Sequence, residues 1–319
     1  MKKICSFLMF IAVAAMSFTS CEVELQEVDN GVAKKVISVI PVTDETKTTL
    51  NGDHSKLEWT AGDNFRLFTD ANGNDPQTLT YSSADAVISA TVSETSKNVY
   101  AYYFAGTYEY TNPTSYTTYI NQKQTQSAAG VFNGQNLPMV GSGIIDGSAV
   151  KLQFKPIASV LALNIYSASA KEGEVIQSVK ITPTNNTKFC GSRSTDLTAE
   201  TVKYDQATSN SDYQYIEVTL DTPSAYAAAK PSDSKAYDGQ IYAVIAKQSY
   251  KSVKFEITTN LGVYTITSSA TTAIDCTAND FIPVNINLAK AVFDEKEPEP
   301  SYIYSLVTCV SGKSSGRLI

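Results

Sequence analysis

The sequence predicts an all-β protein, and three observations carry this prediction. Apolar residues alternate with polar ones along short segments, and these segments are rich in Thr, Tyr, Val and Ile, which prefer strands. Turn dipeptides separate them, among them Asn51-Gly52, Asp146-Gly147 and Leu261-Gly262. No convincing amphipathic helix interrupts the pattern, and one or two helical turns are expected at most, over Ser224–Lys230. Many short strands separated by turns are typical of sandwiches and barrels.

The expected strands follow one another along two domains. In a first domain, residues 34–148, they are Val36–Val42, Lys56–Thr60, Asn64–Thr69 and Asn98–Phe104. In a second domain, residues 149–291, they are Val150–Phe154, Ser159–Tyr166, Ser178–Thr182, Tyr215–Leu220, Gln240–Ala246, Ser252–Thr258, Val263–Ser268 and Ile282–Leu288. The boundary is placed near residue 148 because a polar stretch, Tyr108–Gly134, and a Gly-rich stretch expected to be a loop, Leu137–Gly147, precede it.

Composition argues against several classes of function. A chain of 319 residues can form one large or two ordinary domains. A net charge of −7 argues against a nucleic-acid partner, since binding to a phosphate backbone needs a basic face. The single histidine, His54, leaves little room for His-based catalysis or zinc sites, and no catalytic constellation is found. We therefore expect a protein that is not an enzyme and has no metal or cofactor.

The N-terminus has the layout of a secretory signal. Met1-Lys2-Lys3 precedes an apolar run, Ile4–Phe18, of about 15 residues, which is short of the roughly 20 that a transmembrane helix needs. The run ends at Thr19-Ser20-Cys21, which resembles the lipobox of bacterial lipoproteins, in which the cysteine is acylated and becomes the mature N-terminus. The alternative is an ordinary signal peptide followed by an incidental cysteine.

We expect residues 1–20 to be a signal peptide and residues 21–33 to be a tether behind the lipidated Cys21. An acyl anchor holds a chain in a membrane leaflet without a spanning helix. The acidic residues Glu22, Glu24 and Glu27 resemble the surface-export signal of Bacteroidetes lipoproteins, although a solvated acidic linker explains them nearly as well.

The remaining cysteines set a limit on disulfides. Cys5 lies in the signal peptide, and no CxxC spacing exists, so a zinc ribbon or a redox motif is excluded. Cys190, Cys276 and Cys309 allow one disulfide at most, which the expected compartment permits. Buried free thiols are the alternative.

Several short motifs follow one another in a fixed order along the chain. Lys47–Gly52 is followed by Leu57–Phe68, in which Trp59, a Gly62-Asp63 turn and an apolar strand follow one another, and Leu137-Pro138-Met139 and Leu152–Ala158 come later. In this order the motifs resemble those of the fimbrillin family of Bacteroidetes, lipoproteins that build type V pili. The resemblance covers roughly residues 1–290, and it implies two tandem transthyretin-like antiparallel β-sandwich domains behind a lipoprotein signal peptide. It also implies a location at the outer membrane, on the cell surface or in a fimbrium.

The resemblance further implies assembly with other fimbrial subunits by strand exchange. In the family, a protease removes the N-terminal segment with its first strand, and a strand of the next subunit fills the groove. Here Val36, Val39 and Val42 mark the candidate exchanged strand, and Lys47 is the candidate cleavage site. Family maturation looks arginine-specific, yet no Arg precedes Arg66. Cleavage would therefore use Lys47, which is the better placed, or Lys34-Lys35, or an enzyme of other specificity. Without cleavage the chain would keep its lipid and act as an anchor or accessory subunit.

The last segment, residues 292–319, is expected to be a spacer and a tail. Asp294–Pro300 is acidic and Pro-rich, as a stiff solvated spacer would be. Ser301–Val310 carries apolar residues on both faces, as a strand covered on both sides would. It is either a donor strand or the beginning of a further domain that the chain cuts short, and both interpretations stay open.

Tyrosines supply the candidate contact surface. Tyr100, Tyr102 and Phe104 share one strand face, and core packing is the commoner use of such residues. Tyr108, Tyr110, Tyr116 and Tyr119 lie in polar surroundings and are the candidate adhesive surface for a host or glycan receptor. The leading hypothesis is a structural, accessory or anchor subunit of surface fimbriae. The alternative is a glycan-binding outer-membrane lipoprotein of a polysaccharide-uptake system, and a lipoprotein hydrolase is disfavoured by the single histidine.

Overall fold

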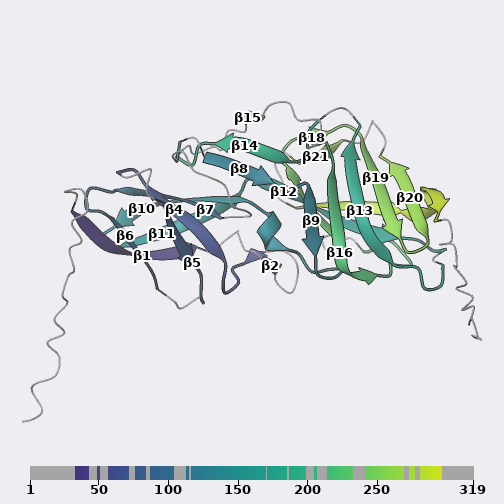
Figure 1. The fold of residues 1–319 in the computed structure, drawn as a ribbon, viewed down its shortest axis with the longest axis horizontal. Helices are drawn as coiled ribbons and strands as arrows, with labels where there is room; N and C mark the ends of the chain where they lie inside the picture. Colours follow the sequence, from purple (N-terminus) through teal and green to yellow (C-terminus); the bar gives the residue numbers. More distant parts are fainter. Residues whose placement is uncertain are drawn as a thin grey trace, which may run out of the picture. The chain divides into compact units, whose positions relative to one another are not determined.

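A computed structural model gives the fold of the chain (Figure 1). It describes residues 33–42, 49–50, 57–71, 76–83, 87–103, 113–114, 116–169, 171–184, 187–198, 205–206, 214–232, 241–268, 273–276 and 281–296. These residues form strands, turns and short 3-10 segments with no α-helix among them, so the predicted all-β fold is confirmed. The helical turns expected over Ser224–Lys230 do not form, because this segment is the end of a strand and an extended connection. No described helix is long and apolar enough to cross a membrane.

The chain divides into two compact units. The first comprises Met1–Ile120, Gly134–Ala158 and Gly191–Ser209, and the second comprises Asn121–Asn133, Ser159–Cys190 and Asn210–Ile319. Each unit therefore takes up segments that lie far apart in the sequence. A single boundary near residue 148 does not describe this division, since the chain passes between the units several times.

A seven-stranded sheet of order β5-β4-β7-β10-β11-β1-β6 forms the first unit. Its strands are β1 (Lys34–Val42), β4 (Asn64–Thr69), β5 (Gln77–Thr80), β6 (Ile88–Ser93), β7 (Asn98–Tyr103), β10 (Met139–Asp146) and β11 (Ala149–Pro156). A three-stranded sheet of β8 (Tyr116–Ile120), β14 (Gly191–Thr195) and β15 (Asp205–Gln206) and a short ladder of β2 (Thr49–Leu50) and β3 (Leu57–Glu58) complete it.

Aromatic rings fill the core on the inner face of this sheet. The ring of Trp59 lies 4.9 Å from that of Phe154 and 5.4 Å from that of Tyr103, both edge-on. The turn after Trp59 is fixed by Asp63, whose carboxylate accepts hydrogen bonds from the Thr60 N–H at 2.7 Å and from the Tyr103 hydroxyl at 3.0 Å. Gly62 adopts φ +97°, which only glycine adopts readily. The motif that carries the family resemblance thus forms a turn and a core anchor.

The segment Leu137–Gly147, expected to be a loop, is the central strand β10. A Cβ at Gly141 would lie 3.1 Å from the Phe154 ring, and a Cβ at Gly143 would collide with the Lys151 carbonyl oxygen. These glycines allow β11 to approach closely, so they do not mark a loop. Asp146-Gly147 is the hairpin between β10 and β11, and β11 therefore belongs to the first unit and not to a domain beginning at residue 149.

Two main sheets form the second unit. The larger has the order β23-β20-β19-β13-β16-β9, with β9 (Lys123–Gln126), β13 (Ile176–Pro183), β16 (Ile216–Ser224), β19 (Val253–Thr259), β20 (Gly262–Thr267) and β23 (Val292–Glu295). The smaller has the order β17-β12-β22, with β12 (Ala158–Tyr166), β17 (Ile241–Ala246) and β22 (Phe281–Asn287). A two-stranded ladder joins β18 (Ser249–Tyr250) and β21 (Ile274–Asp275).

Three strand pairs depart from the expected antiparallel arrangement. β1 runs parallel to β11, β12 runs parallel to β22, and β9 runs parallel to β16. The tail also differs, because Val292–Glu295 forms the edge strand β23 beside β20 and is not part of a spacer. A parallel pair joins segments that are distant in the sequence, and local alternation does not reveal it.

Candidate functional site

The candidate exchanged strand, β1, lies between two neighbours of the first sheet. It pairs in parallel with β11 from Ser38 to Val42 and antiparallel with β6 from Lys34 to Val39. Backbone hydrogen bonds continue past these ladders, from the Ser38 N–H to the Ser148 carbonyl oxygen at 2.7 Å and from the Glu94 N–H to the Ala33 carbonyl oxygen at 2.9 Å. β1 is therefore the element that joins β6 to the rest of the sheet.

Only one face of β1 contributes to the core. Ile37 and Val39 are 1% and 0% exposed, whereas Val36 and Ile40 are 63% and 45% exposed. Of the three valines chosen from the sequence, Val39 is buried, Val42 is half-buried and Val36 points away from the core. The inward residues are thus Ile37 and Val39. Sequence alone does not separate the faces, because both carry large aliphatic side chains.

A side-chain amide holds β6 on its other side. The Gln77 Nε2, on the edge strand β5, donates to the Thr91 carbonyl oxygen of β6, and the Thr91 N–H donates to the Gln77 Oε1 at 3.1 Å. Gln77 thus presents the donor and the acceptor that a neighbouring strand would present. Since β5 and β6 are the two edges of the sheet, this exposed contact connects them in addition to the pairing of β6 with β1.

In the second unit, glutamine side-chain amides also bind the edge of a strand, and there they are buried. The Gln124 Nε2 on β9 donates to the Val244 carbonyl oxygen at 2.8 Å, and the Val244 N–H donates to the Gln124 Oε1 at 2.9 Å. The Gln126 Oε1 accepts from the Tyr242 N–H at 2.9 Å. The edge of β17 is therefore covered by two glutamine amides of the other sheet.

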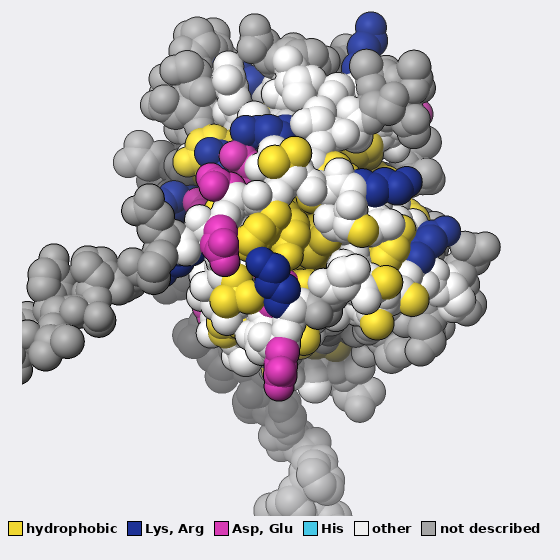
Figure 2. All heavy atoms as spheres, turned by 90° about the vertical axis from the view of Figure 1, so that its right-hand side faces the viewer, with side chains coloured by type: hydrophobic (Ala, Val, Ile, Leu, Met, Phe, Trp, Pro, Cys, Tyr) yellow, Lys and Arg dark blue, Asp and Glu magenta, His cyan; other side chains and the backbone are white. Residues whose placement is uncertain are grey.

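β22 has an edge without a strand. Among the residues that the structure describes, it pairs only with β12, and most of its side chains are half-buried. A groove of about 330 Å³ lies beside it, lined by apolar side chains that include Ile266, Ile282 and Val284. Figure 2 shows hydrophobic side chains gathered on one face of the second unit, with separate basic and acidic side chains among them.

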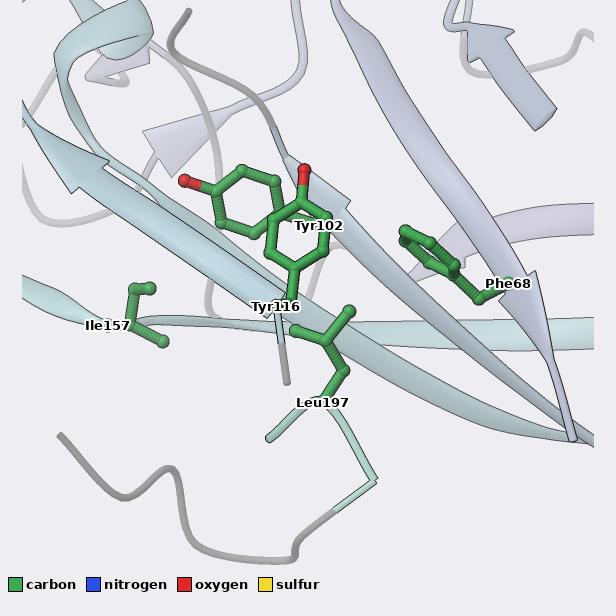
Figure 3. Close-up of a cluster of buried hydrophobic side chains, with 5 residues drawn as sticks. All are labelled: Phe68, Tyr102, Tyr116, Ile157 and Leu197. Carbon is green, nitrogen blue, oxygen red and sulfur yellow. The ribbon is translucent and has the colours of Figure 1, made fainter. Parts of the chain in front are cut away.

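The predicted adhesive tyrosines do not form one exposed surface. β8 pairs with β14, and its alternate residues point inward, so Tyr116 is 1% exposed. The Tyr116 ring packs against Tyr102, Phe68, Ile157 and Leu197 in a buried cluster (Figure 3). The interpretation of Tyr116 as an exposed contact is therefore wrong, and Tyr119 is half-buried. Tyr108 and Tyr110 lie outside the described residues.

The other predicted site residues are placed only in part. Cys21, Lys47 and Ser301–Val310 lie outside the described residues. Cys190 and Cys276 are buried thiols that no disulfide joins, and Cys309 lies outside the described part. Burial, with a smaller contribution from Asp275, raises the pKa of the Cys276 thiol to about 12, so the thiol is protonated at neutral pH.

A buried carboxylate in the second unit has a structural explanation. Glu174 is 4% exposed and accepts hydrogen bonds from the hydroxyls of Tyr226, Tyr264 and Thr259. Burial and then Glu174 raise the pKa values of both tyrosines, so their hydroxyls remain donors. In the described part of the chain, no group of three or more His, Cys, Asp and Glu side chains could hold a metal ion.

Solved structures provide the comparison with known proteins. A candidate cell adhesion protein from Bacteroides ovatus matches 83% of this chain and 97% of its own, with a TM-score of 0.50 and 13% identity. The chain has the fold of that protein. A candidate cell adhesion protein from Bacteroides uniformis matches with a TM-score of 0.42 and 12% identity over 82% of this chain and 96% of its own.

A fimbrial assembly protein from Parabacteroides distasonis matches with a TM-score of 0.36 and 10% identity over 82% of this chain and 99% of its own. No protein-family model and no curated protein sequence matches the chain. The all-β, sandwich-like architecture expected from the fimbrillin resemblance is therefore confirmed at the level of the fold.

Proposed function

We propose that the chain is a non-catalytic subunit of surface fimbriae that assembles by strand exchange at the position of β1 and contributes to adhesion. The observation that carries this proposal is the place of β1, between β11 and β6, with only one buried face. A strand bound in this way can be replaced by any extended segment that offers main-chain hydrogen bonds and two apolar side chains at alternate positions.

The energetics of β1 suit such an exchange. Burial of Ile37 and Val39 stabilises the first unit by roughly 2 kcal/mol per side chain, and the exposed Val36 and Ile40 add little. Loss of β1 would leave the hydrogen-bonding edges of β11 and β6 open, and the exposed contact of Gln77 with Thr91 would remain as a weak link between β5 and β6. The result is a slot with two strand edges, which is unfavourable until another strand fills it.

The maturation scheme is part of the proposal. The precursor is acylated at Cys21 and reaches the cell surface as an outer-membrane lipoprotein. Cleavage at Lys47 then removes the lipidated N-terminal segment, which includes β1. Ser301–Val310, apolar on both faces, is the proposed donor strand. A head-to-tail exchange of this kind builds an open filament, because each subunit offers one slot and one strand.

The N-terminus of the cell-surface protein tests this proposal. Mass spectrometry of the polymerised form should find a chain beginning at Thr48, and the membrane-bound precursor should begin at a lipid-modified Cys21. Cys21→Ala should remove the protein from the membrane fraction, with Cys276→Ala as the matched control. A surface protein that begins only at Cys21 contradicts a role as an exchanging subunit, and membrane association of Cys21→Ala contradicts the lipid anchor.

A further inference from the structure

A small polar pocket lies on the outer face of the first sheet, on the side away from its core. Its volume is about 230 Å³, and its lining combines aromatic, aliphatic, hydroxyl and amide groups: Asn98, Tyr100, Ser142, Ile144, Leu197 and Thr198. Cross-strand pairs form its floor, since Tyr100 of β7 faces Ser142 of β10 and Asn98 faces Ile144. Ile144 is 74% exposed and offers an apolar surface to a ligand in the pocket.

A firmly held loop forms the wall of the pocket. The Leu197 N–H donates to the Pro113 carbonyl oxygen at 2.7 Å, and the Leu197 side chain packs into the buried cluster with Tyr102 and Tyr116 (Figure 3). The Thr198 N–H and hydroxyl both donate to Asp196 Oδ1, at 2.8 and 2.7 Å. The pocket is therefore formed before any ligand arrives, and little order has to be gained on binding.

Two carboxylates orient the polar groups at the floor. Asp70 accepts hydrogen bonds from the Asn98 N–H at 3.1 Å and from the Asn98 Nδ2 at 2.9 Å, which fixes the amide of Asn98. Burial, followed by the charges of Asp70 and Asp196, raises the pKa of the Tyr100 phenol, so both carboxylates lie near this ring. Among the described residues, the hydroxyls of Tyr100 and Ser142 have no hydrogen-bond partner and can serve a ligand.

From this arrangement we propose that the pocket binds one neutral sugar ring of a glycan. A sugar ring presents C–H groups on one face, which suit Tyr100, Ile144 and Leu197, and hydroxyls at its edge, which suit Ser142, Thr198 and Asn98. The volume lies below the roughly 300 Å³ at which sites for larger ligands begin, so it fits a single ring. Asp70 and Asp196 disfavour an anionic sugar by charge repulsion.

This site is independent of strand exchange. Its residues lie on the outer face of β7 and β10, whereas β1 contacts β11 and β6. Glycan binding here would give the proposed adhesin a receptor class, and it is equally compatible with the alternative role in polysaccharide uptake. The proposal rests on the pocket alone and can hold or fail whatever the outcome for assembly.

Saturation-transfer NMR on the uncleaved full chain tests the site. The probes are the methyl glycosides of glucose, galactose and mannose, with N-acetylneuraminic acid as the anionic comparison, each at millimolar concentration. We expect transfer to at least one neutral glycoside, with its C–H protons closest to the protein, and none to N-acetylneuraminic acid. Tyr100→Ala should weaken binding at least tenfold, whereas Tyr119→Ala, a matched change on β8, should leave it unchanged.

Fluorescence of Trp59, the single tryptophan, shows whether each variant keeps the core of the first unit. Ser142→Tyr is a second variant that fills the pocket from an exposed position, and it should abolish binding. The proposal is overturned if no neutral glycoside receives saturation, if N-acetylneuraminic acid binds as well as they do, or if folded Tyr100→Ala and Ser142→Tyr bind like the unchanged chain.

Discussion

β1 and β22 are the first and the last long strands that the structure describes, and they occupy comparable positions in their units. Each runs parallel to a middle strand, β1 to β11 and β22 to β12, and those two strands follow each other directly in the sequence. β1 has a second neighbour, β6, on its other edge. Among the described residues β22 has none, and an apolar groove lies beside it.

The two units thus place a strand beside β1 and, among the described residues, none beside the outer edge of β22. Around β1 the sheet is complete, yet half of the strand's large side chains face away from the core. Among the described residues the sheet ends beside β22, and the half-buried Ile282 and Val284 line a groove there. The proposed exchange requires the position of β1 to be open in the same way after cleavage.

Removal of β1 should destabilise the chain more than any single substitution. A chain that begins at Thr48 loses the burial of Ile37 and Val39 and the hydrogen bonds to both neighbours, at a cost of about 5 kcal/mol or more. We expect it to multimerise or to unfold well below the melting temperature of the longer chain, as measured by light scattering and calorimetry.

Truncation after Ala291 is the comparison, because it removes the largely exposed edge strand β23 together with residues 297–319, which include the proposed donor strand. It should cost much less stability and leave the chain monomeric. Equal losses for the two truncations would refute the special role of β1.

Single substitutions in β1 should distinguish its faces. Ile37→Ala removes a buried side chain and should lower the free energy of unfolding by about 2–4 kcal/mol. Val36→Ala, one residue away on the exposed face, should change it by less than about 0.5 kcal/mol. Urea denaturation measures both values, and similar losses would show that both faces of β1 are covered.

The glutamine amide contacts of the two units should contribute different amounts to stability. Gln124→Ala leaves the buried N–H and carbonyl of Val244 without partners, at an expected cost of about 2–3 kcal/mol. Gln77→Ala should cost less than about 1 kcal/mol, because the contact with Thr91 is exposed and water can replace it. Amide hydrogen exchange at Val244 and Thr91 follows each contact directly, and a larger effect at Thr91 would reverse the comparison.

Replacement of Cys276 should have the smallest effect on stability near neutral pH and a measurable effect at high pH. Its pKa is raised in the folded state, from 9.0 to about 12, so its contribution to stability is complete below pH 9 and is lost as the pH rises towards 12. Cys276→Ala should therefore flatten the fall of stability between pH 9 and 12. Denaturation at several pH values measures this slope, and an unchanged slope would mean that the thiol is accessible to solvent.

The sequence predicts most apolar strands, but it misses strands whose glycine or polar residues are explained only by contacts with strands distant in the sequence. β1, β4 and β7 are found because they are rich in β-branched and aromatic residues, and β12 and β17 because they are short apolar runs, which are buried along almost their whole length. β10 is missed because Gly141 and Gly143 resemble a loop, although they allow close approach of β11. β9 is missed because Gln124 and Gln126 are polar, although their amides are buried against β17.

The candidate sites, too, are predicted from the sequence only as far as local patterns reveal them. The exchanged strand is located from the sequence, but its inward face is not, because Val36 and Ile37 are equally apolar neighbours. The sugar pocket combines Tyr100 with Leu197 and Thr198, which are almost a hundred positions away in the sequence. No local pattern brings these residues together, since their proximity comes from the pairing of β8 with β14.

One binding measurement tests the exchange of β1 most directly. A chain ending at Lys296, with a specific protease site inserted after Lys47, is mixed before and after cutting with a fluorescent peptide of the sequence Ser301–Val310. The peptide should bind only the cut chain, and the β1 fragment should be released as the peptide binds, as followed by anisotropy and mass spectrometry. A cut chain that keeps β1 and does not bind the peptide, or an uncut chain that binds it equally well, would refute strand exchange at the position of β1.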